Sequence, residues 1–445
     1  MSTAATTNDF KKLLLGSLQK ELDSSNTNYY VGLSRSENNL NIGTTTSSTL
    51  REQLEVRHEL QSIKAISNSS FVVPTKDWVG ATVYNAWDDN NLTLESFYVQ
   101  NEDREVFVCV ETPKNGVGEP LTSNVQPTST LAGSSSRTFA TSDLYKWRWL
   151  YKISNADYSN YKSTDYMPVK VVTAIAPSIP EESIQKGLQN QSVSGEIIGI
   201  AIDSAGYGYT IAPSLSIEGD GINASFQAVV SAGKIVSVRV DSDNGGSYTH
   251  GTGYNFATVT PSYGTAAFRP IIAPRDGLSA DPRQTLFADS LMMQIDFQNN
   301  ETDTILAENE FRSVALLSGL KKYGSDSATS INTGNTLNNF TVSGASGTFT
   351  DDEIISNQSG TASARVFTHD LAGNTVYYFQ TDSTGFGSFA NNQSIVGASV
   401  NATIDAINNP NVDRYSGDIL YINNVDAISR ASNQTEDIRI VIKLD

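Results

Sequence analysis

Cysteine and histidine are almost missing from this chain of 445 residues. Cys109 is the single cysteine, which excludes an internal disulfide framework and any zinc site that needs several cysteines. The three histidines, His58, His250 and His369, lie far apart in the sequence, so a histidine-rich metal cluster is not expected.

Long apolar runs are missing as well. No stretch approaches the roughly 18 apolar residues of a membrane span, and the longest apolar run near the start is Leu13 to Leu15. The sequence thus predicts neither a signal peptide nor a membrane-spanning segment.

Charged residues are few, and acidic residues outnumber basic ones. Charged residues make up 18% of the chain, and 48 acidic against 30 basic residues give a net charge of −18 at pH 7. Such a charge repels nucleic acids and anionic membranes, so neither is expected as a partner. With 38% hydrophobic and 9% aromatic residues the chain is not disordered as a whole, and its length favours two to four domains.

Glycine (32 residues), tyrosine (19 residues), serine, threonine and asparagine are plentiful, which favours short strands joined by turns. Apolar residues at helical spacing predict a helix over 8–23, through Phe10, Leu14, Leu15, Leu18 and Leu22. A second helix is predicted over 49–64, with Thr49 as its N-cap. A long surface loop is predicted over 115–142. Strands are predicted over 28–36, 71–74, 94–100, 105–111, 146–153, 167–175, 266–273, 291–297, 311–323, 418–424 and 436–444.

Two blocks of the chain are internally repetitive. In the first, GEIIGIAIDS (195–204) matches GKIVSVRVDS (233–242) without gaps, and GYGYT (206–210) is echoed by TGYNF (252–256). In the second, GTFTDDEII (347–355) is echoed by GSFANNQSIV (387–396) with a one-residue slip, and GTASARV (360–366) by GASVNATI (397–404). Each block is interpreted as a duplicated β-unit.

The repeats predict a mainly β fold, with a discontinuous β-rich host domain that carries two short N-terminal helices and two inserted small β-repeat modules. The host domain would comprise residues 1–193, 263–337 and 408–445. The inserted modules would comprise residues 194–262 and 338–407.

Acidic residues stand side by side at three places: Asp88-Asp89, Glu181-Glu182 and Asp351-Asp352-Glu353. A glycosidase needs two carboxylates that face each other across a cleft, which neighbours in sequence do not supply. We interpret these acids as solvated turn residues. The aspartates of the first repeat block lack the dense spacing of a calcium loop and are interpreted in the same way: Asp203, Asp220, Asp241 and Asp243.

Nucleophilic catalysis is not indicated either. No G-x-S-x-G motif occurs, and Cys109 lies inside the apolar run VFVCV, which predicts a buried side chain. His58 falls on the second predicted helix, while His250 and His369 fall in predicted turns, and all three are interpreted as exposed or hydrogen-bonded. The sequence therefore predicts a protein that is not an enzyme, with no catalytic, cofactor-binding or metal-binding residue and no cofactor.

The segment KWRWLYKI (146–153) is the most amphipathic predicted strand. Trp147, Trp149 and Tyr151 would lie on one face, with the side chains of Lys146, Arg148 and Lys152 on the other. The first interpretation is a core strand with a charged outer face. The second is a contact that the basic face makes with another protein.

Six segments outside the repeat blocks carry a resemblance to a known family. They are NTNYYVGLSRSE (26–37), VVPTKDW (72–78), EVFVCVETP (105–113), LYKWRWLYKI (144–153), YSGDILYINN (415–424) and NQTEDIRIVIKL (433–444). Through these segments the chain resembles the baseplate wedge subunit of T-even-type contractile-tailed bacteriophages, the product of gene eight. The last two segments are the most specific match, whereas a Leu-Ser pair between Gly32 and Arg35 departs from the family's Gly-Arg-Ser-Glu.

The resemblance implies a mainly β structural protein of the virion, located in the tail baseplate after assembly in the host cytoplasm. Its implied partners are other baseplate wedge proteins and a second copy of itself, as a homodimer within each wedge. Its role would be to hold neighbouring wedge proteins together during assembly and during rearrangement of the baseplate on host contact. The repeat blocks are similar to decorations in structural proteins of cyanobacterial myophages.

Two other functions stay open. A receptor- or glycan-binding tail protein would stack sugars on Tyr207, Tyr209, Tyr248 and Tyr254 of the first repeat block, although the same tyrosines could pack one β-unit on the next. A polysaccharide-degrading enzyme would have only scattered carboxylates to work with.

Overall fold

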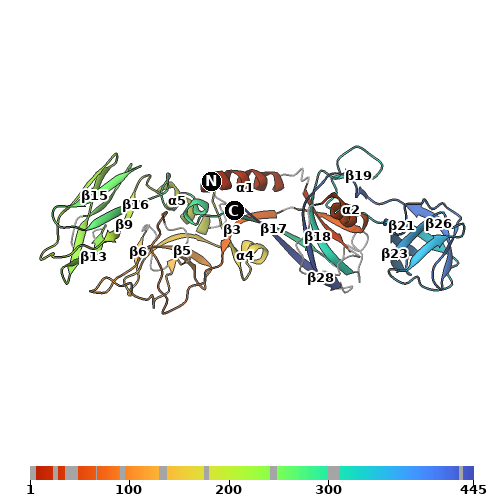
Figure 1. Cartoon of the computed structure of the whole chain (residues 1–445), viewed down its shortest axis with the longest axis horizontal. Helices are drawn as coiled ribbons and strands as arrows, with labels where there is room; N and C mark the ends of the chain where they lie inside the picture. The colour runs from red at the N-terminus through yellow and green to blue at the C-terminus, as the bar shows by residue number, and fades with distance from the viewer. Residues whose placement is uncertain are drawn as a thin grey trace. The chain divides into compact units, whose positions relative to one another are not determined.

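The computed structural model describes residues 7–23, 29–35, 49–66, 68–90, 96–129, 138–174, 180–240, 248–298, 310–429 and 434–444. It is mainly β, with 44% strand and 12% helix, which confirms the predicted fold class. The chain divides into two compact units (Figure 1). The first unit comprises Met1–Ser17, Ser70–Met292 and Val441–Asp445, and the second comprises Leu18–Ser69 and Met293–Ile440.

This division crosses the predicted domain boundaries. It falls inside four elements: α1 (Asn8–Leu22), β3 (Asn68–Pro74), β17 (Ser290–Phe297) and β29 (Glu436–Lys443). The three strands belong with β8 (Tyr166–Pro168) to a sheet of order β29-β17-β3-β8. The predicted arrangement of a host domain with two inserts stays a prediction.

An antiparallel sheet rich in aromatic residues forms one core of the first unit. Its order is β4-β5-β7-β6, with bounds Tyr98–Gln100, Glu105–Glu111, Lys146–Lys152 and Phe139–Ala140. Cys109 is buried among Phe107, Trp147 and Trp149, as its apolar neighbours predict. The short strand β6 lies within the segment that the sequence predicts to be a loop.

Three short helices of the first unit are absent from the sequence-based prediction. They are α4 (Asn155–Tyr161), α5 (Pro180–Asn190) and α6 (Pro282–Thr285). Capping side chains start two of them, because Ser154 accepts a hydrogen bond from the backbone of Asp157 and Asp281 accepts one from that of Arg283. The strand predicted over 167–175 ends at Pro168.

The first repeat block folds into eight strands. Four of them form a sheet of order β10-β15-β16-β9, and two hairpin-like pairs, β11 with β14 and β12 with β13, complete the block. Strand β16, which lies in the predicted host domain, pairs with β9. The bounds are β9 (Ile197–Ser204), β10 (Leu215–Gly219), β11 (Ile222–Ser225), β12 (Gln227–Ser231), β13 (Lys234–Arg239), β14 (Thr249–Thr252), β15 (Ala257–Pro261) and β16 (Ala267–Ile272).

The two halves of this block have equivalent glycine-containing corners, and the corner of each half donates a hydrogen bond to the other half, in a crosswise interlock. Gly195 precedes β9 and Gly233 precedes β13, both with positive φ. The backbone N–H of Tyr254 donates to the carbonyl of Gly195 at 3.2 Å, and that of Tyr209 donates to the carbonyl of Gly233 at 3.1 Å. A Cβ on Gly195 would lie 2.3 Å from the Tyr254 nitrogen, so only glycine allows this approach. The equivalent corners are therefore 206–209 and 251–254, one residue from the predicted register.

The second unit is built on an antiparallel sheet of order β20-β2-β1-β18-β28. The core of this sheet includes Tyr30, Ile63 and Leu317. Two very short strands, β19 and β27, pair beside it. The bounds are β1 (Tyr29–Ser34), β2 (Leu60–Ala65), β18 (Glu310–Ser318), β19 (Lys321–Lys322), β20 (Thr333–Asn335), β27 (Val412–Asp413) and β28 (Asp418–Ser429).

The second predicted helix, over 49–64, is correct only in its first part. Helix α2 (Leu50–His58) begins after the N-cap Thr49, but it ends before Leu60, where strand β2 begins. Leu60 and Ile63 are spaced for a helix face and yet are buried between β1 and β20 as parts of a strand. Burial in the sheet core outweighs the local helical pattern here.

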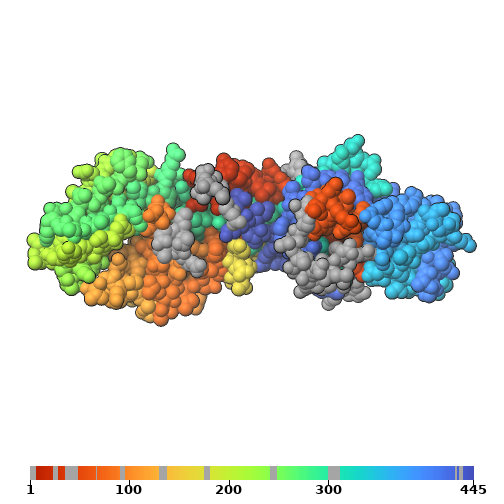
Figure 2. Space-filling model, in the orientation of Figure 1, coloured from red at the N-terminus to blue at the C-terminus, as the bar shows by residue number. Residues whose placement is uncertain are grey.

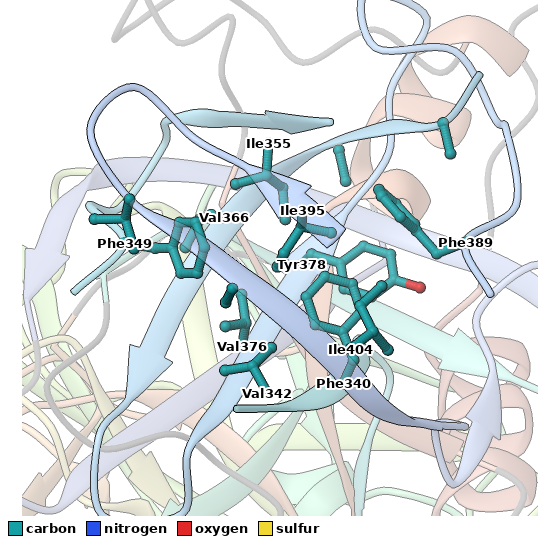
Figure 3. Packing of buried hydrophobic residues seen from close by; sticks show 14 residues of the cluster. Phe340, Val342, Phe349, Ile355, Val366, Val376, Tyr378, Phe389, Ile395 and Ile404 are labelled. Atoms are coloured by element: carbon teal, nitrogen blue, oxygen red, sulfur yellow. The ribbon is translucent and has the colours of Figure 1, made fainter. Parts of the chain in front are cut away.

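The second repeat block closes into a barrel of order β21-β24-β23-β22-β25-β26. The rings of Phe340, Tyr378 and Phe389 pack inside it with centroids 4.6–5.5 Å apart (Figure 3). The bounds are β21 (Asn338–Ser343), β22 (Ile354–Asn357), β23 (Ser363–Asp370), β24 (Thr375–Phe379), β25 (Ser394–Val396) and β26 (Asn401–Asn408).

In the barrel, the two copies of the repeat align at their tight turns without the predicted one-residue slip. Asp352 and Asn392 both have positive φ, at 66° and 64°. The next residue in each turn accepts a hydrogen bond at its side chain, Glu353 from the backbone of Thr350 and Gln393 from that of Ala390. Phe349 and Phe389, three residues before these αL positions, are both buried in the barrel core.

Candidate functional site

The predicted acid pairs are not simply solvated. Asp88 holds Arg269 in a bidentate ion pair with distances of 3.0 and 2.6 Å, and Glu182 lies 2.8 Å from Lys170. Asp352 pairs with Arg35 at 2.6 Å. The interpretation as solvated turn residues is therefore wrong for Asp88 and Glu182, whose side chains are mostly buried against their cations. Asp352 is an exposed turn residue, as predicted, that also pairs with Arg35. No two of the three acid pairs are brought together by a contact between described side chains.

The histidines and the cysteine hold structural positions. His58 Nδ1 lies 2.9 Å from the Tyr415 hydroxyl, and His250 Nδ1 lies 2.7 Å from the carbonyl of Ile197. His250 and His369 lie on strands β14 and β23 and not in turns. Burial raises the pKa of the Cys109 thiol well above its ordinary value, so a thiolate nucleophile is disfavoured.

Of the aspartates considered for calcium, the structure describes Asp203 and Asp220. Asp220 is exposed, and its carboxylate accepts hydrogen bonds from the side chain and backbone of Asn255, which hold its pKa below the ordinary value. Asn255 lies 35 residues along the chain, so this contact is not the predicted Asx turn. Asp241 and Asp243 lie outside the described residues. Among the residues that the structure describes, no group of three His, Cys, Asp or Glu side chains could hold a metal ion.

The tyrosines considered for sugar stacking separate into two kinds. Tyr209 and Tyr254 are buried, and their hydroxyls accept hydrogen bonds from the backbone of Ala266 and of Ala224. They pack one half of the block on the other. Tyr207 is 77% exposed, so of the four it alone presents a largely open ring.

The outer face of β7 is covered in its middle, at Arg148. Arg148 is as buried as Trp147 and Trp149, and its guanidinium pairs with the buried carboxylate of Glu196 at 3.3 and 3.4 Å. Glu196 immediately precedes β9, so the basic face contacts the chain's own first repeat block. The expected charged outer face is correct for Lys146 and Lys152 and wrong for Arg148, whose partner lies far along the sequence.

An exposed apolar face on α1 was not predicted. The buried side of the helix carries Leu15 and Leu22, whereas Phe10, Leu13 and Leu14 are 51%, 66% and 46% exposed. Figure 2 shows α1, in red, at the surface of the molecule. Residues spaced i, i+3 and i+4 share a helix face, so these three side chains form one apolar patch. Leu13 could have indicated this exposed face from the sequence, because it lies outside the single apolar stripe by which a surface helix packs on the core.

Strand β28 offers a second exposed apolar surface. It lies at the end of its sheet, paired only with β18 among the described strands. A bulge leaves Leu420 opposite no residue of β18, and Leu420 and Tyr421 are 53% and 46% exposed. Its sequence, DILYINNVDAIS, has no lysine and no proline, the residues that commonly prevent an edge strand from pairing with another chain.

Acidification should weaken the barrel through His369. Its Nδ1 accepts a hydrogen bond from the backbone N–H of Phe349 at 3.2 Å, which requires a neutral ring. Burial holds the pKa of His369 below 6.5, and the charge of Asp370 only partly opposes this. As the pH falls through the unfolded-state value, the unfolded chain takes up a proton that the folded barrel does not, so stability falls.

Hydrogen exchange of the barrel amides should therefore be faster at pH 5.5 than at pH 7.5, after correction for the intrinsic rate. A His369→Phe variant should reduce this difference, whereas His250→Phe, in the first unit, should leave it in place. An unchanged pH dependence in the His369→Phe variant would show that another group is responsible.

The described residues include no helix long and apolar enough to cross a bilayer. Two of the surfaces with exposed apolar side chains, the α1 face and the β28 edge, are the candidate functional sites. No protein-family model matches the chain, and no curated protein is significantly similar to it.

Proposed function

We propose that the chain is a structural subunit of a bacteriophage tail baseplate wedge, which holds neighbouring wedge proteins together during assembly and during rearrangement on host contact. The proposed location is the virion baseplate, and the proposed partners are other wedge proteins and a second copy of the chain. The observation that carries this proposal is the exposed edge of β28. That strand contains most of YSGDILYINN (415–424), one of the two segments with the most specific resemblance to the family.

An edge strand with exposed apolar side chains is suited to protein assembly. Its unpaired N–H and C=O groups can extend a sheet into a neighbour, and alternate side chains then give specificity. Leu420 and Tyr421 would supply the apolar area of such a contact. The α1 face lies in the other unit, so the chain has a candidate contact surface in each of its two units. A connecting subunit needs at least two such surfaces.

The test is where the protein lies and whether β28 holds it there. In virions that carry a tagged copy, gold labelling should place the protein inside the baseplate disc. A Leu420→Lys variant should be incorporated roughly tenfold less, since a charge would be buried in the contact, while its thermal unfolding stays unchanged. Quantitative mass spectrometry of purified particles measures the incorporation.

Leu371→Lys is the matched control, because Leu371 is also exposed and also lies in the second unit. This variant should be incorporated normally. Label found only at fibre tips would overturn the proposed function. Equal incorporation of the two lysine variants would overturn the role of β28.

A further inference from the structure

A cavity of about 410 Å³ in the first unit concentrates positive charge. Its lining includes three lysines from separate parts of the chain: Lys11 of α1, Lys76 after β3 and Lys443 at the end of β29. Among the described residues that line it, Asp289 is the single carboxylate. The volume lies within the usual range of small-molecule sites, roughly 300–1,000 Å³.

The cavity lies on the packed side of α1. Lys11 follows Asn8 by three residues and precedes Leu15 by four, so these residues share one face of the helix. Leu15 is buried, and Asn8 and Lys11 line the cavity. The site is therefore separate from the exposed α1 face.

Two of the three ammonium groups have no acidic partner in the described part of the chain. No carboxylate there lies within 4 Å of the Lys11 or Lys443 nitrogen. Asp9, the acid closest to Lys11 in the sequence, lies 3.8 Å from Lys12 instead. Both charges are therefore available to a ligand.

This excess of positive charge favours a ligand with more than one negative charge. The formal charges of three lysines and Asp289 sum to +2, in a chain whose net charge is −18. A ligand with a single charge neutralises half of the excess, whereas a ligand with two or more neutralises all of it. Distant acidic residues do not cancel the excess, because interactions beyond about 8 Å are screened at physiological ionic strength.

Part of the cavity wall is apolar. Phe287 and Tyr166, both half-buried, line it beside Pro74. The ring of Phe287 stacks on Trp87 with centroids 5.7 Å apart and packs edge-on against Phe97. These contacts hold Phe287 at a φ of 53°, a backbone conformation that bulky residues seldom adopt. The wall thus offers contacts for a carbon skeleton beside the lysines.

We propose that this cavity binds a small organic molecule with at least two anionic groups, either phosphates or carboxylates. Lys11 and Lys443 donate charged hydrogen bonds to these groups, and the carbon skeleton lies against Phe287. The site uses no side chain of the α1 face or of β28, so it goes beyond the proposed role in assembly and does not depend on it.

Calorimetric titration of the full-length chain at fixed ionic strength tests the site with three probes. They are trimesate, a benzene ring with three carboxylates; benzoate, the same ring with one; and tripolyphosphate, which has no carbon skeleton. Trimesate should bind saturably, with a Kd at least tenfold below that of benzoate. A still lower Kd for tripolyphosphate would identify phosphate as the preferred group. Absence of saturable binding by both polyanions, or equal Kd values for trimesate and benzoate, would contradict the proposal.

Two pairs of lysine substitutions locate the site. Lys11→Gln with Lys443→Gln should raise the Kd of trimesate at least tenfold. Lys114→Gln with Lys234→Gln removes the same charge at two exposed lysines outside this cavity and should change the Kd less than twofold. Equal effects of the two pairs would assign binding to the general charge of the chain and overturn the proposal. Lys76 is kept because it makes a further interaction in the folded chain.

A second measurement uses the unchanged chain and so does not depend on how the variants fold. Acetylation of lysine amines, followed by peptide mass spectrometry, should slow at least threefold at Lys11 and Lys443 when trimesate is saturating. Lys114 and Lys234 should react at the same rate with and without trimesate. Unprotected amines at Lys11 and Lys443 in the saturated chain would rule out binding in this cavity.

Discussion

Replacing Arg57 by methionine should lower the free energy of unfolding of the second unit by about 3–5 kcal/mol. The buried guanidinium donates hydrogen bonds to the carbonyl oxygens of Arg414, Ser416 and Gly417, each at 2.7 Å. Methionine has a similar length but donates nothing, so the three carbonyl oxygens lose their charged donor. Such bonds contribute about 1.5–3 kcal/mol each, and the total is smaller than their sum because one side chain makes all three.

The two units can be followed separately in this experiment. All four tryptophans, at positions 78, 87, 147 and 149, lie in the first unit. Hydrogen exchange of the β1 and β18 amides therefore measures the loss in the second unit, while tryptophan fluorescence should report unchanged unfolding of the first. If the amides of β1 and β18 remain as protected as in the original chain, Arg57 does not hold this unit together.

Arg51→Met is the control on the same helix. Arg51 is exposed and pairs with Glu55 at 3.1 Å, four residues along α2. Exposed pairs of this kind contribute about 0.3–0.5 kcal/mol, so the control should change protection little. Arg57 also fixes the segment that leads into β28, and its loss should therefore loosen the proposed assembly edge as well.

Replacing Arg148 alone by methionine should destabilise the first unit by about 3–5 kcal/mol, because it leaves the Glu196 carboxylate buried without its cation. Replacing both partners, Arg148→Met with Glu196→Leu, should restore stability to within about 1 kcal/mol of the original chain. The attraction of a buried pair is largely offset by the cost of removing both charges from water. Urea unfolding followed by tryptophan fluorescence measures the full cycle, since Trp147 and Trp149 flank Arg148.

Lys152 and Glu181 provide the matched comparison. Lys152 lies on the same strand, but this pair is exposed and 3.9 Å apart. Its coupling energy should stay below about 1 kcal/mol. A double variant at Arg148 and Glu196 that is as unstable as the two single losses combined would give a coupling energy near zero and contradict this prediction.

The sequence allows prediction of features whose cause is local. The strands at 105–111 and 146–152, the buried Cys109 and the N-cap Thr49 follow from alternation, apolar neighbours and capping chemistry. The repeats are also visible, because equivalent backbone positions need equivalent residues, such as glycine at 195 and 233.

The rest depends on partners that lie far along the chain. Burial of Arg148 follows from Glu196, and the end of α2 follows from the strands that pair with Leu60 and Ile63. The candidate surfaces were missed for a related reason. Phe10 and Leu14 fit a buried helical stripe in sequence, and only the packing of Leu15 and Leu22 shows that they lie on the opposite, exposed side.

The crosswise interlock of the first repeat block also determines how it can fold and how it can evolve. Ile197 of the first half is covered by Tyr254 of the second, and Ile235 of the second half packs with Tyr209 of the first. During synthesis the first half leaves the ribosome before the second half. Its apolar face therefore stays exposed until the second half has been made. One copy alone is half of a cooperative unit, so deletion or acquisition of this block by recombination should succeed only with both halves together.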